Sequence, residues 1–252
     1  MIKGENIWKV YRVGTLRRKE VVALRGVDIE IHKGETLALV GESGCGKSTL
    51  GKVLLMLLKP DRGKVLFKGV DLTKLSKGEL RKYRLRMQLI PQHPEDALDP
   101  RWKIYDSIAE PLRIHKLVES KEKEQNRVYE LAELIGLKEE HLNRYPHEVS
   151  GGELQRAVIA RALALNPEFI VCDEPTSMLD VSTQASIVRL LLKLQRLFDI
   201  TYLFITHDLE LARVVADRIA IMKDGKIVKV VKSEQLREIS REVCTISAQS
   251  KA

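Results

Sequence analysis

The stretch that decides the fold is Gly41-Glu42-Ser43-Gly44-Cys45-Gly46-Lys47-Ser48. It follows an apolar run, Thr36–Val40, typical of a buried strand, and precedes a predicted helix over 47–59 with helically spaced apolar residues. Glycines between a strand and a helix let backbone N–H groups face a phosphate. Lys47 adds a cation, and the Ser48 hydroxyl can bind Mg²⁺. An ordinary turn explains the glycines but not Lys and Ser at these offsets, so the stretch predicts a nucleotide-phosphate-binding loop.

The composition is that of one large compact domain. The chain has 252 residues, of which 44% are hydrophobic and 31% charged, with 15 Gly and 8 Pro. These values exclude disordered, collagen-like and disulfide-scaffold proteins, and a chain of this length buries about 70% of its unfolded surface. The longest apolar candidate, Leu50–Leu58, falls far short of the roughly 20 residues that cross a bilayer. We therefore expect the chain not to span a membrane by itself.

The N-terminus and the cysteines favour a reducing cytoplasm. Met1–Tyr11 has no apolar run between a basic stretch and a small-residue cleavage site, so we expect no signal peptide. Cys45, Cys172 and Cys244 are an odd number of cysteines without metal-ligand spacing.

The net charge points to no particular macromolecular partner. Lys and Arg exceed Asp and Glu by 43 − 35 = 8, but the surplus is spread along the chain. Mixed runs such as Ser120–Gln125 are typical of a solvated helix face. We therefore expect no nucleic-acid partner.

Strand-like and helix-like segments alternate along the chain, which predicts an α/β fold with a largely parallel sheet. A pair of strands near the C-terminus flanks Asp224 and Gly225, a pair favoured in two-residue hairpin turns. The predicted strands, besides Thr36–Val40, are 21–31, 169–172, 201–205, 218–222 and 226–231, and a helix is predicted around 182–198.

Charged helical segments interrupt this alternation between about 81 and 149. Ser120 is a candidate N-cap and Gly136 a candidate terminator of one helix in this region. We expect a single domain over 1–252, with its core over about 1–92 and 155–235, a helical insertion over about 93–154 and a flexible tail over 239–252.

Two adjacent carboxylates, Asp173 and Glu174, follow the apolar run 169–172. They are expected at the carboxyl edge of the sheet, where α/β proteins bind ligands. Adjacent strand residues point to opposite sides, so Asp173 would face a metal while Glu174 activates a water as general base. A polar strand end before Pro175 would be the better interpretation of the pair alone, but not beside an intact phosphate loop.

The segment Ser150-Gly151-Gly152-Glu153-Leu154-Gln155-Arg156 resembles the signature sequence of ATP-binding cassette (ABC) ATPases. Gln92, the run Ser177–Asp180 and His207 occur in the order expected of that family. The resemblance implies a P-loop NTPase (RecA-like) core with a mostly parallel sheet, an N-terminal antiparallel β subdomain and an inserted helical subdomain. It also implies hydrolysis of ATP with Mg²⁺.

Ser150 and Glu153 have the spacing of a capping box, which would open a helix whose N-terminus can receive an anion. By the resemblance, this helix end closes on the γ-phosphate held by the phosphate loop of a second, head-to-tail subunit. The family most often has Gln where this chain has Glu153. A carboxylate there would repel a triphosphate unless it turns back onto the Ser150 N–H.

The resemblance also assigns a role to each site residue. Tyr11 is expected to stack on the adenine, with Trp8 as a competitor, and Asp180 to couple the two sites at the subunit interface. The catalytic residues are Glu174, His207, Gln92 and Lys47. The expected nucleotide contacts are Gly41, Glu42, Ser43, Gly44, Cys45, Gly46, Lys47, Ser48, Thr49, Tyr11, Ser150, Gly151, Gly152 and Asp180. The expected Mg²⁺ ligands are Ser48, Gln92 and Asp173.

The segments Gln92–Arg101 and Ile108–Leu112 resemble the second ATPase subunit of dipeptide, oligopeptide and nickel importers. This implies a second ABC ATPase subunit, usually non-identical although a homodimer is an alternative, two transmembrane permease subunits and, indirectly, a solute-binding protein. The expected location is the cytoplasmic face of the cell membrane, as a peripheral subunit. Because the chain ends soon after its terminal hairpin, as nickel-importer subunits do, peptide and nickel both remain candidate solutes.

Two other functions use some of these motifs. A soluble ABC ATPase acting on nucleic acid or in assembly would share all of them, but DNA-repair members separate the motifs by long coiled coils. Here Lys47 and Ser150 are 103 positions apart in a single cassette. A small-molecule kinase would explain the phosphate loop but would leave the signature segment and His207 without a role.

Overall fold

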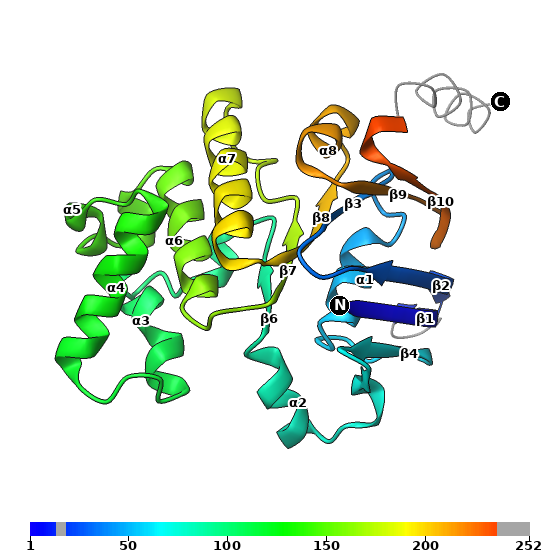
Figure 1. Ribbon diagram of the computed structural model, residues 1–252, viewed down its shortest axis with the longest axis horizontal. Helices are drawn as coiled ribbons and strands as arrows, with labels where there is room; N and C mark the ends of the chain where they lie inside the picture. Colours follow the sequence, from blue (N-terminus) through cyan, green and yellow to red (C-terminus); the bar gives the residue numbers. More distant parts are fainter. Residues whose placement is uncertain (14–18, 236–252) are drawn as a thin grey trace. The chain divides into compact units, whose positions relative to one another are not determined.

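The structure is a computed structural model that describes residues 1–13 and 19–235 (Figure 1). The described chain forms two compact units. The first unit consists of Met1–Thr73 and Leu203–Ala252, and the second of Lys74–Tyr202. The tail expected over 239–252, with Cys244, lies outside the described residues.

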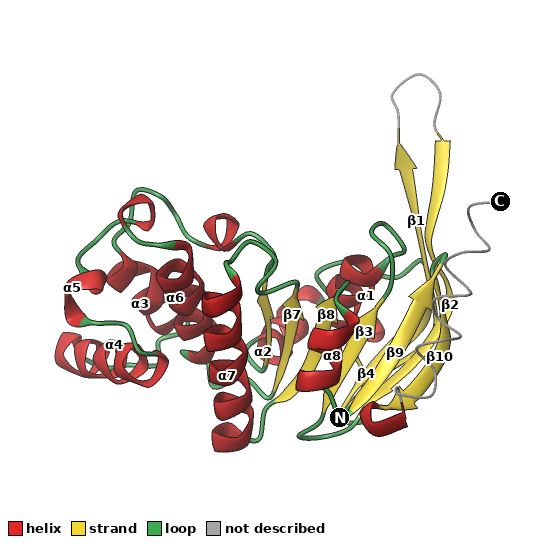
Figure 2. Ribbon diagram, turned by 90° about the horizontal axis from the view of Figure 1, so that it is seen from above, coloured by secondary structure: helices red, strands yellow, loops and turns green. Residues whose placement is uncertain are grey.

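An antiparallel sheet forms the N-terminal part of the first unit. Its strand order is β2-β1-β4-β5, and Figure 2 shows β1 and β2 as a long hairpin. The strands are β1 (Ile2–Val13), β2 (Lys19–Ile31), β4 (Arg62–Phe67) and β5 (Val70–Asp71). Register shifts between Gly4 and Trp8 break the alternation of side chains in β1. This explains why the residues did not predict β1, although the antiparallel subdomain itself was expected.

A second sheet of the first unit carries the phosphate loop. Its order is β10-β9-β3-β8, with β3 (Thr36–Val40) parallel to β9 (Arg218–Lys223). β8 (Thr201–Thr206) and β3 are buried at every position, as expected of strands covered on both faces. β9 and β10 (Lys226–Lys232) form the predicted hairpin, whose turn residues Asp224 and Gly225 both have positive φ.

The helix after the phosphate loop is shorter than predicted. α1 spans Lys47–Leu54 instead of continuing to residue 59. Met56 adopts a φ of 53°, and the N–H groups of Leu57 and Leu58 both donate to the Lys52 carbonyl. Such bonds to a carbonyl in the last turn close the end of a helix. The helical spacing of apolar residues continues past this end, which is why the sequence predicted a longer helix. Within the described residues of this unit, one further α-helix is present, α8 (Leu209–Val215).

The second unit is mainly helical, with the parallel strand pair β6 (Met87–Ile90) and β7 (Phe169–Asp173). Figure 1 shows α3 to α6 gathered in one group. The helices are α2 (Lys77–Arg84), α3 (Ile104–Ile114), α4 (Lys121–Ile135), α5 (Glu139–Leu142), α6 (Gly151–Leu163) and α7 (Val181–Phe198). Short 3-10 turns also occur in the described chain. They span Leu72–Lys74 and Ser233–Gln235 in the first unit or at its boundary, and Pro94–Ala97 and Pro146–Glu148 in the helical region.

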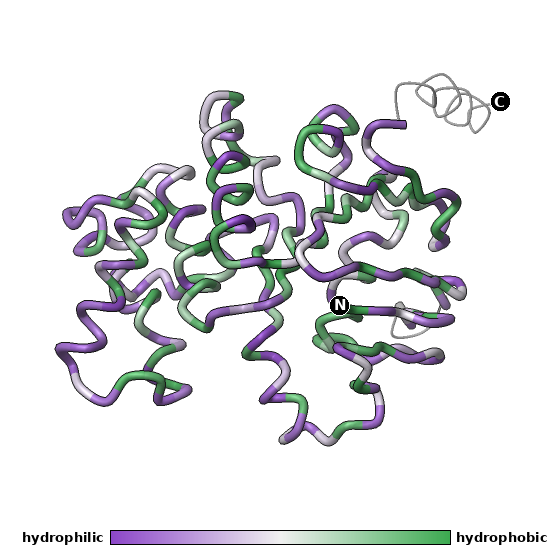
Figure 3. The backbone as a smooth tube through the Cα atoms, viewed as in Figure 1, coloured by the Kyte–Doolittle hydropathy of each residue, from purple (hydrophilic) through white to green (hydrophobic). Residues whose placement is uncertain are grey.

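Helix α4 begins and ends where the sequence predicted. The Ser120 hydroxyl accepts from the Lys123 N–H, and Gly136 closes the helix with a φ of 73°. Figure 3 shows that the first turns of α4 are hydrophilic. The expectation of a solvated face is wrong at Glu124, however, because its side chain is buried against Arg113.

No helix within residues 1–13 and 19–235 is both long enough and apolar enough to cross a bilayer.

Candidate functional site

The phosphate loop is shaped by glycine backbone conformations that other residues avoid. Gly46 is the N-cap of α1 with a φ of 111°, and a Cβ on it would meet the Ala23 carbonyl oxygen at 2.5 Å. Gly44 has a φ of 78° but has open space around it. Gly46 is therefore required both by its conformation and by the closeness of β2.

Lys47 lies inside the curl of its own loop. Its ammonium Nζ donates to the carbonyl oxygens of Gly41 at 2.7 Å and Glu42 at 2.9 Å. The residue is only 5% exposed, so its ammonium group is shielded from solvent and bonds to the loop carbonyls instead. A phosphate that enters the loop would meet this ammonium and the N-terminal N–H groups of α1.

The turn between β9 and β10 holds the phosphate loop in place. The Gly225 N–H donates to the Cys45 carbonyl at 3.0 Å, and the Gly225 carbonyl accepts from the Arg25 N–H at 2.9 Å. A Cβ on Gly225 would meet the Ala23 carbonyl oxygen at 2.8 Å. The sequence predicted the hairpin, but no pattern in it predicted that the hairpin would contact the phosphate loop, 180 positions earlier in the chain.

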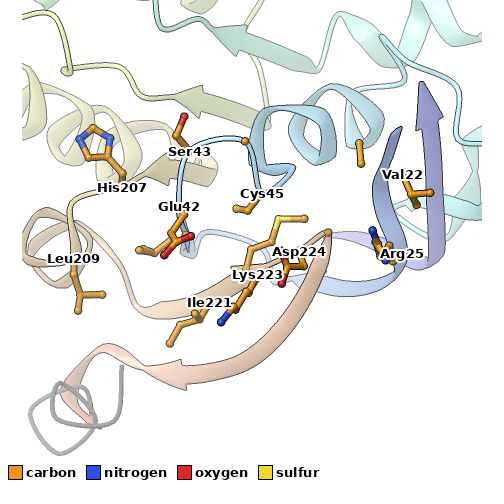
Figure 4. Close-up of a pocket in the computed structure, with 16 residues that line it drawn as sticks. Val22, Arg25, Glu42, Ser43, Cys45, His207, Leu209, Ile221, Lys223 and Asp224 are labelled. Carbon is orange, nitrogen blue, oxygen red and sulfur yellow. The ribbon is translucent and has the colours of Figure 1, made fainter. Parts of the chain in front are cut away.

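A cavity of about 600 Å³ adjoins this loop within the first unit. Residues of the phosphate loop, β2, β9 and the segment after β8 line it. In the view of Figure 4, His207, Ser43 and Glu42 lie at one end of it and Arg25 and Val22 at the other. His207 itself is solvent-exposed at the end of β8.

Burial raises the pKa of the Cys45 thiol, and the Lys47 ammonium opposes this shift only in part. A thiol that stays protonated is a weak nucleophile. Cys45 therefore sits in the phosphate loop as a small, partly buried side chain.

Tyr11 and Trp8, the two candidates for adenine stacking, have different neighbours. The Tyr11 hydroxyl lies 3.4 Å from Thr49 Oγ1, in the first turn of α1. The Trp8 indole donates to Asn6 Oδ1 at 2.9 Å and lies against Gly26. Of the two aromatic residues, Tyr11 is thus the one whose side chain contacts the helix that follows the phosphate loop.

The two predicted carboxylates lie at the end of β7, in the second unit. Asp173 is its last residue and is 7% exposed. Glu174 follows with a φ of 47°, so it belongs to the turn and not to the strand. The argument from strand alternation therefore does not apply to this pair, because the strand ends at Asp173. The Gln92 amide, which follows β6, donates to Glu174 Oε2 at 3.4 Å.

The signature segment forms the predicted capping box at the start of α6. The Ser150 hydroxyl accepts from the Glu153 N–H at 3.3 Å, and Glu153 Oε2 accepts from the Ser150 N–H at 2.8 Å. The bond from the Ser150 N–H is the main cause that holds the pKa of the Glu153 carboxyl below its usual range. The carboxylate is thus turned back onto the backbone, as the sequence required.

The start of α7 packs directly on this helix end. A Cβ on Gly152 would meet the Thr183 methyl group at 2.6 Å, so only glycine fits there. Asp180 caps α7 by accepting from the N–H groups and hydroxyls of Ser182 and Thr183. The Ser182 hydroxyl bond is the largest of the effects that lower the pKa of the Asp180 carboxyl.

The predicted site residues thus fall in two groups. The phosphate loop, Tyr11 and His207 belong to the first unit, and Gln92, Asp173, Glu174, Ser150 and Asp180 to the second. Among residues 1–13 and 19–235, no three or more His, Cys, Asp or Glu side chains are grouped to hold a metal. The hydroxyl, amide and carboxylate oxygens of Ser48, Gln92 and Asp173 are nevertheless the hard donors that Mg²⁺ prefers beside nucleotide phosphates.

Comparison with known proteins agrees with these motifs. Residues 24–177 match the family described as ABC transporter. The chain is 49% identical over 222 residues to the oligopeptide transport ATP-binding protein OppF of Bacillus subtilis (strain 168), covering 88% of this chain and 73% of that protein. It is 50% identical over 221 residues to the glutathione import ATP-binding protein GsiA of Escherichia coli O157:H7, covering 87% of this chain and 35% of that protein.

A solved structure has the same fold. It is the dimeric structure of a post-hydrolysis state of an ATP-binding cassette bound to ADP and Pi. The TM-score is 0.84 at 34% sequence identity, with 92% of this chain and 99% of that chain covered. The α/β architecture expected from the sequence is therefore confirmed, namely a P-loop NTPase core with an antiparallel β subdomain and an inserted helical subdomain.

Proposed function

Since the chain belongs to the ABC transporter family of ATP-binding proteins and is an ATPase, we propose that it powers an importer of dipeptides and oligopeptides. The observation that supports peptides as the solute is the 49% identity to an oligopeptide transport ATP-binding protein over 88% of this chain. The similarity to a glutathione import protein points the same way, because glutathione is itself a small peptide.

We assign the nucleotide to the phosphate loop. Gly41 to Thr49 surround the β- and γ-phosphates with N–H groups, and Lys47 supplies the cation. Tyr11 stacks on the adenine, and the 3.4 Å contact of its hydroxyl with Thr49 supports this choice over Trp8. Ser48, Gln92 and Asp173 are assigned to a magnesium ion, which when bound neutralises charge on the phosphate oxygens.

In the proposed reaction, Glu174 accepts a proton from the water that attacks the γ-phosphate. The Gln92 amide donates to the Glu174 carboxylate and so orients it toward that water. Lys47 stabilises the charge on the phosphate oxygens as the bond to the leaving ADP breaks. His207, exposed at the end of β8, is assigned to contact the γ-phosphate.

Helix α6, called the signature helix because it begins within the signature segment, would complete the site of a neighbouring subunit. Gly151 is exposed and Gly152 half-buried at the start of α6, and neither has a side chain that would cover the first N–H groups of the helix. The Ser150 hydroxyl accepts from Glu153 N–H and can still donate its own hydrogen to a phosphate oxygen. We therefore propose a head-to-tail dimer in which each nucleotide meets one phosphate loop and the opposite Ser150, with Asp180 between the two sites.

The proposed partners are a second ABC ATPase subunit and two transmembrane permease subunits, with a solute-binding protein acting through them. The helical insertion, over about 93–154, and the loop after Gln92 would face the permease subunits. The chain would then lie at the cytoplasmic face of the cell membrane. The core over about 1–92 and 155–235 would hold the nucleotide.

The experiment is to isolate the tagged full chain from its native membrane and to identify the proteins that accompany it. MgATP hydrolysis by that complex is then measured with its solute-binding protein and either a mixed peptide library or Ni²⁺. Stimulation by peptides supports the proposal. Stimulation by Ni²⁺ alone, or recovery with no permease subunits, contradicts it.

A further inference from the structure

A histidine contacts the glutamate of the capping box that begins the signature helix. Glu153 presents two carboxylate oxygens with different partners. Oε2 accepts from the Ser150 N–H at 2.8 Å, while Oε1 lies 3.2 Å from Nε2 of His141. His141 is in the short helix α5 and is 8% exposed, so its ring is held in the helical region rather than in solvent.

The hydrogen-bond geometry assigns the tautomer of His141. The Lys138 N–H donates to His141 Nδ1 at 3.3 Å, so that nitrogen is the acceptor. In the neutral ring the hydrogen then resides on Nε2, which points at Glu153 Oε1. The result is a continuous chain of contacts from the α5 backbone through His141 and Glu153 to Ser150.

This arrangement differs from the serine–glutamate capping box with the same spacing at the start of α2. There Glu79 Oε2 accepts from both the N–H and the hydroxyl of Ser76. Among the residues that the structure describes, no histidine pairs with Glu79, whereas Glu153 has His141 at 3.2 Å. Glu140 also lies near the imidazole, at 3.6 Å. The histidine is therefore an addition to the serine–glutamate capping box of α6 that the one of α2 lacks.

We propose that His141 is a positioning residue, which holds the Glu153 carboxylate away from the anion-binding face of the signature helix. The inference rests on the proposed function, because it assumes that Ser150 meets the γ-phosphate of a neighbouring subunit. Without its imidazole partner, Glu153 Oε1 is an unpaired negative oxygen in the first turn. It then competes with the phosphate for the N–H groups of Gly151 and Gly152 and repels the triphosphate.

The test is a double-mutant cycle in the complex assembled with its partner subunits. His141→Phe is expected to raise KM for MgATP by about three- to tenfold, the size of one lost charge-assisted hydrogen bond, with kcat nearly unchanged. In a Glu153→Gln background the same substitution should change KM by less than about twofold, because a neutral amide does not compete with phosphate. His141→Gln, which keeps an N–H donor, should restore KM to less than half of the His141→Phe value.

Two results would overturn the proposal. The first is an equal KM change for His141→Phe in both backgrounds, which is what a purely structural role of α5 produces. The second is no change in the background that retains Glu153. Glu79→Gln is the matched control for loss of a capping carboxylate and should leave KM unaltered.

A measurement without mutation at the site keeps the test independent of folding defects. The ¹⁵N shifts of the neutral His141 imidazole in the full chain should report the tautomer that carries its hydrogen on Nε2. An Nδ1-protonated ring would overturn the assignment. If the unaltered complex hydrolyses no MgATP, the proposed function fails, whereas unchanged hydrolysis with a background-independent KM refutes only the role of His141.

Discussion

The Gln92 side-chain amide lies 3.4 Å from the Glu174 carboxylate, although 82 positions separate the two residues. Gln92 follows β6 and Glu174 follows β7, and because these strands are parallel, their carboxyl ends meet at one sheet edge. Glu174 also has a φ of 47°, a conformation that costs a non-glycine residue free energy and is concentrated at functional sites. The contact therefore links the two residues assigned to orient and activate the attacking water.

Lys47→Ala should weaken MgATP binding by about tenfold to a hundredfold. The substitution removes a buried ammonium and leaves the Gly41 and Glu42 carbonyls without that donor. Isothermal titration with a nonhydrolysable ATP analogue measures the effect. Lys52→Ala, an exposed lysine of the same helix, is the control, and an equal loss of affinity in both variants would count against the assignment.

Gly225→Ala should weaken nucleotide binding even though Gly225 belongs to a distant hairpin. An added Cβ would meet the Ala23 carbonyl oxygen at 2.8 Å, and the turn would then shift away from Cys45. We expect the free energy of unfolding to fall by about 2–4 kcal/mol and Kd for MgATP to rise several-fold.

The matched control is Gly69→Ala, since Gly69 has a φ of 82° with nothing within 4 Å of an added Cβ. It should cost about 1 kcal/mol of stability, from the backbone conformation alone, and leave Kd unchanged. Urea unfolding and nucleotide titration of both variants separate the two effects. Identical behaviour of the two alanine variants would contradict the role of the hairpin.

Alkylation of Cys45 should be slow at neutral pH and blocked by nucleotide. Burial raises the pKa of this thiol, so the reactive thiolate and the alkylation rate grow as the pH rises through and beyond 9. Cys172 is fully buried with a pKa raised further by desolvation, so it should stay unreactive in the folded chain. The measurement uses a Cys244→Ser chain with and without saturating MgATP. Equal rates in both conditions would mean that the loop does not engage nucleotide.

Glu124 should make the stability of the helical region depend on pH. Its hydrogen bonds from Arg113, 2.6 and 2.8 Å long, are the main cause that lowers the pKa of the carboxyl. Since the folded pKa is depressed, the stabilisation is complete above the unfolded value near 4.5 and is lost as the pH falls through the folded value. Glu124→Gln should therefore lower the free energy of unfolding by about 1–3 kcal/mol at pH 7, and by progressively less below 4.5.

The control for that variant is Glu122→Gln, an exposed carboxylate on the same helix. Urea denaturation at pH 7 and at pH 3.5 gives the comparison. A destabilisation by Glu124→Gln that is the same at both pH values would show that the ion pair is not its cause.

Local signals predicted much of the fold because they act over a few residues. The Ser120 cap, the Gly136 terminator and the Asp224-Gly225 turn all form where the sequence placed them. The end of α1 was missed, because Met56 adopts positive φ while the apolar spacing continues past it. The burial of Glu124 was missed because Arg113, its partner, lies on a different helix.

The site was predicted motif by motif, but not the contacts that join the motifs. The phosphate loop and the Ser150 capping box each follow from a segment of four to eight consecutive residues, whose local chemistry specifies the structure. The Gly225 bond to Cys45 and the His141 contact with Glu153 depend on how separate elements pack. No spacing rule in a single sequence encodes such contacts.

The most direct test of the account is the rate of MgATP hydrolysis by the assembled complex carrying Glu174→Gln. Removing the general base should lower kcat by about a hundredfold or more while MgATP still binds, so that nucleotide stays trapped in the closed dimer. Turnover at the rate of the unaltered complex would contradict the assignment of Glu174, and with it the proposed mechanism of hydrolysis.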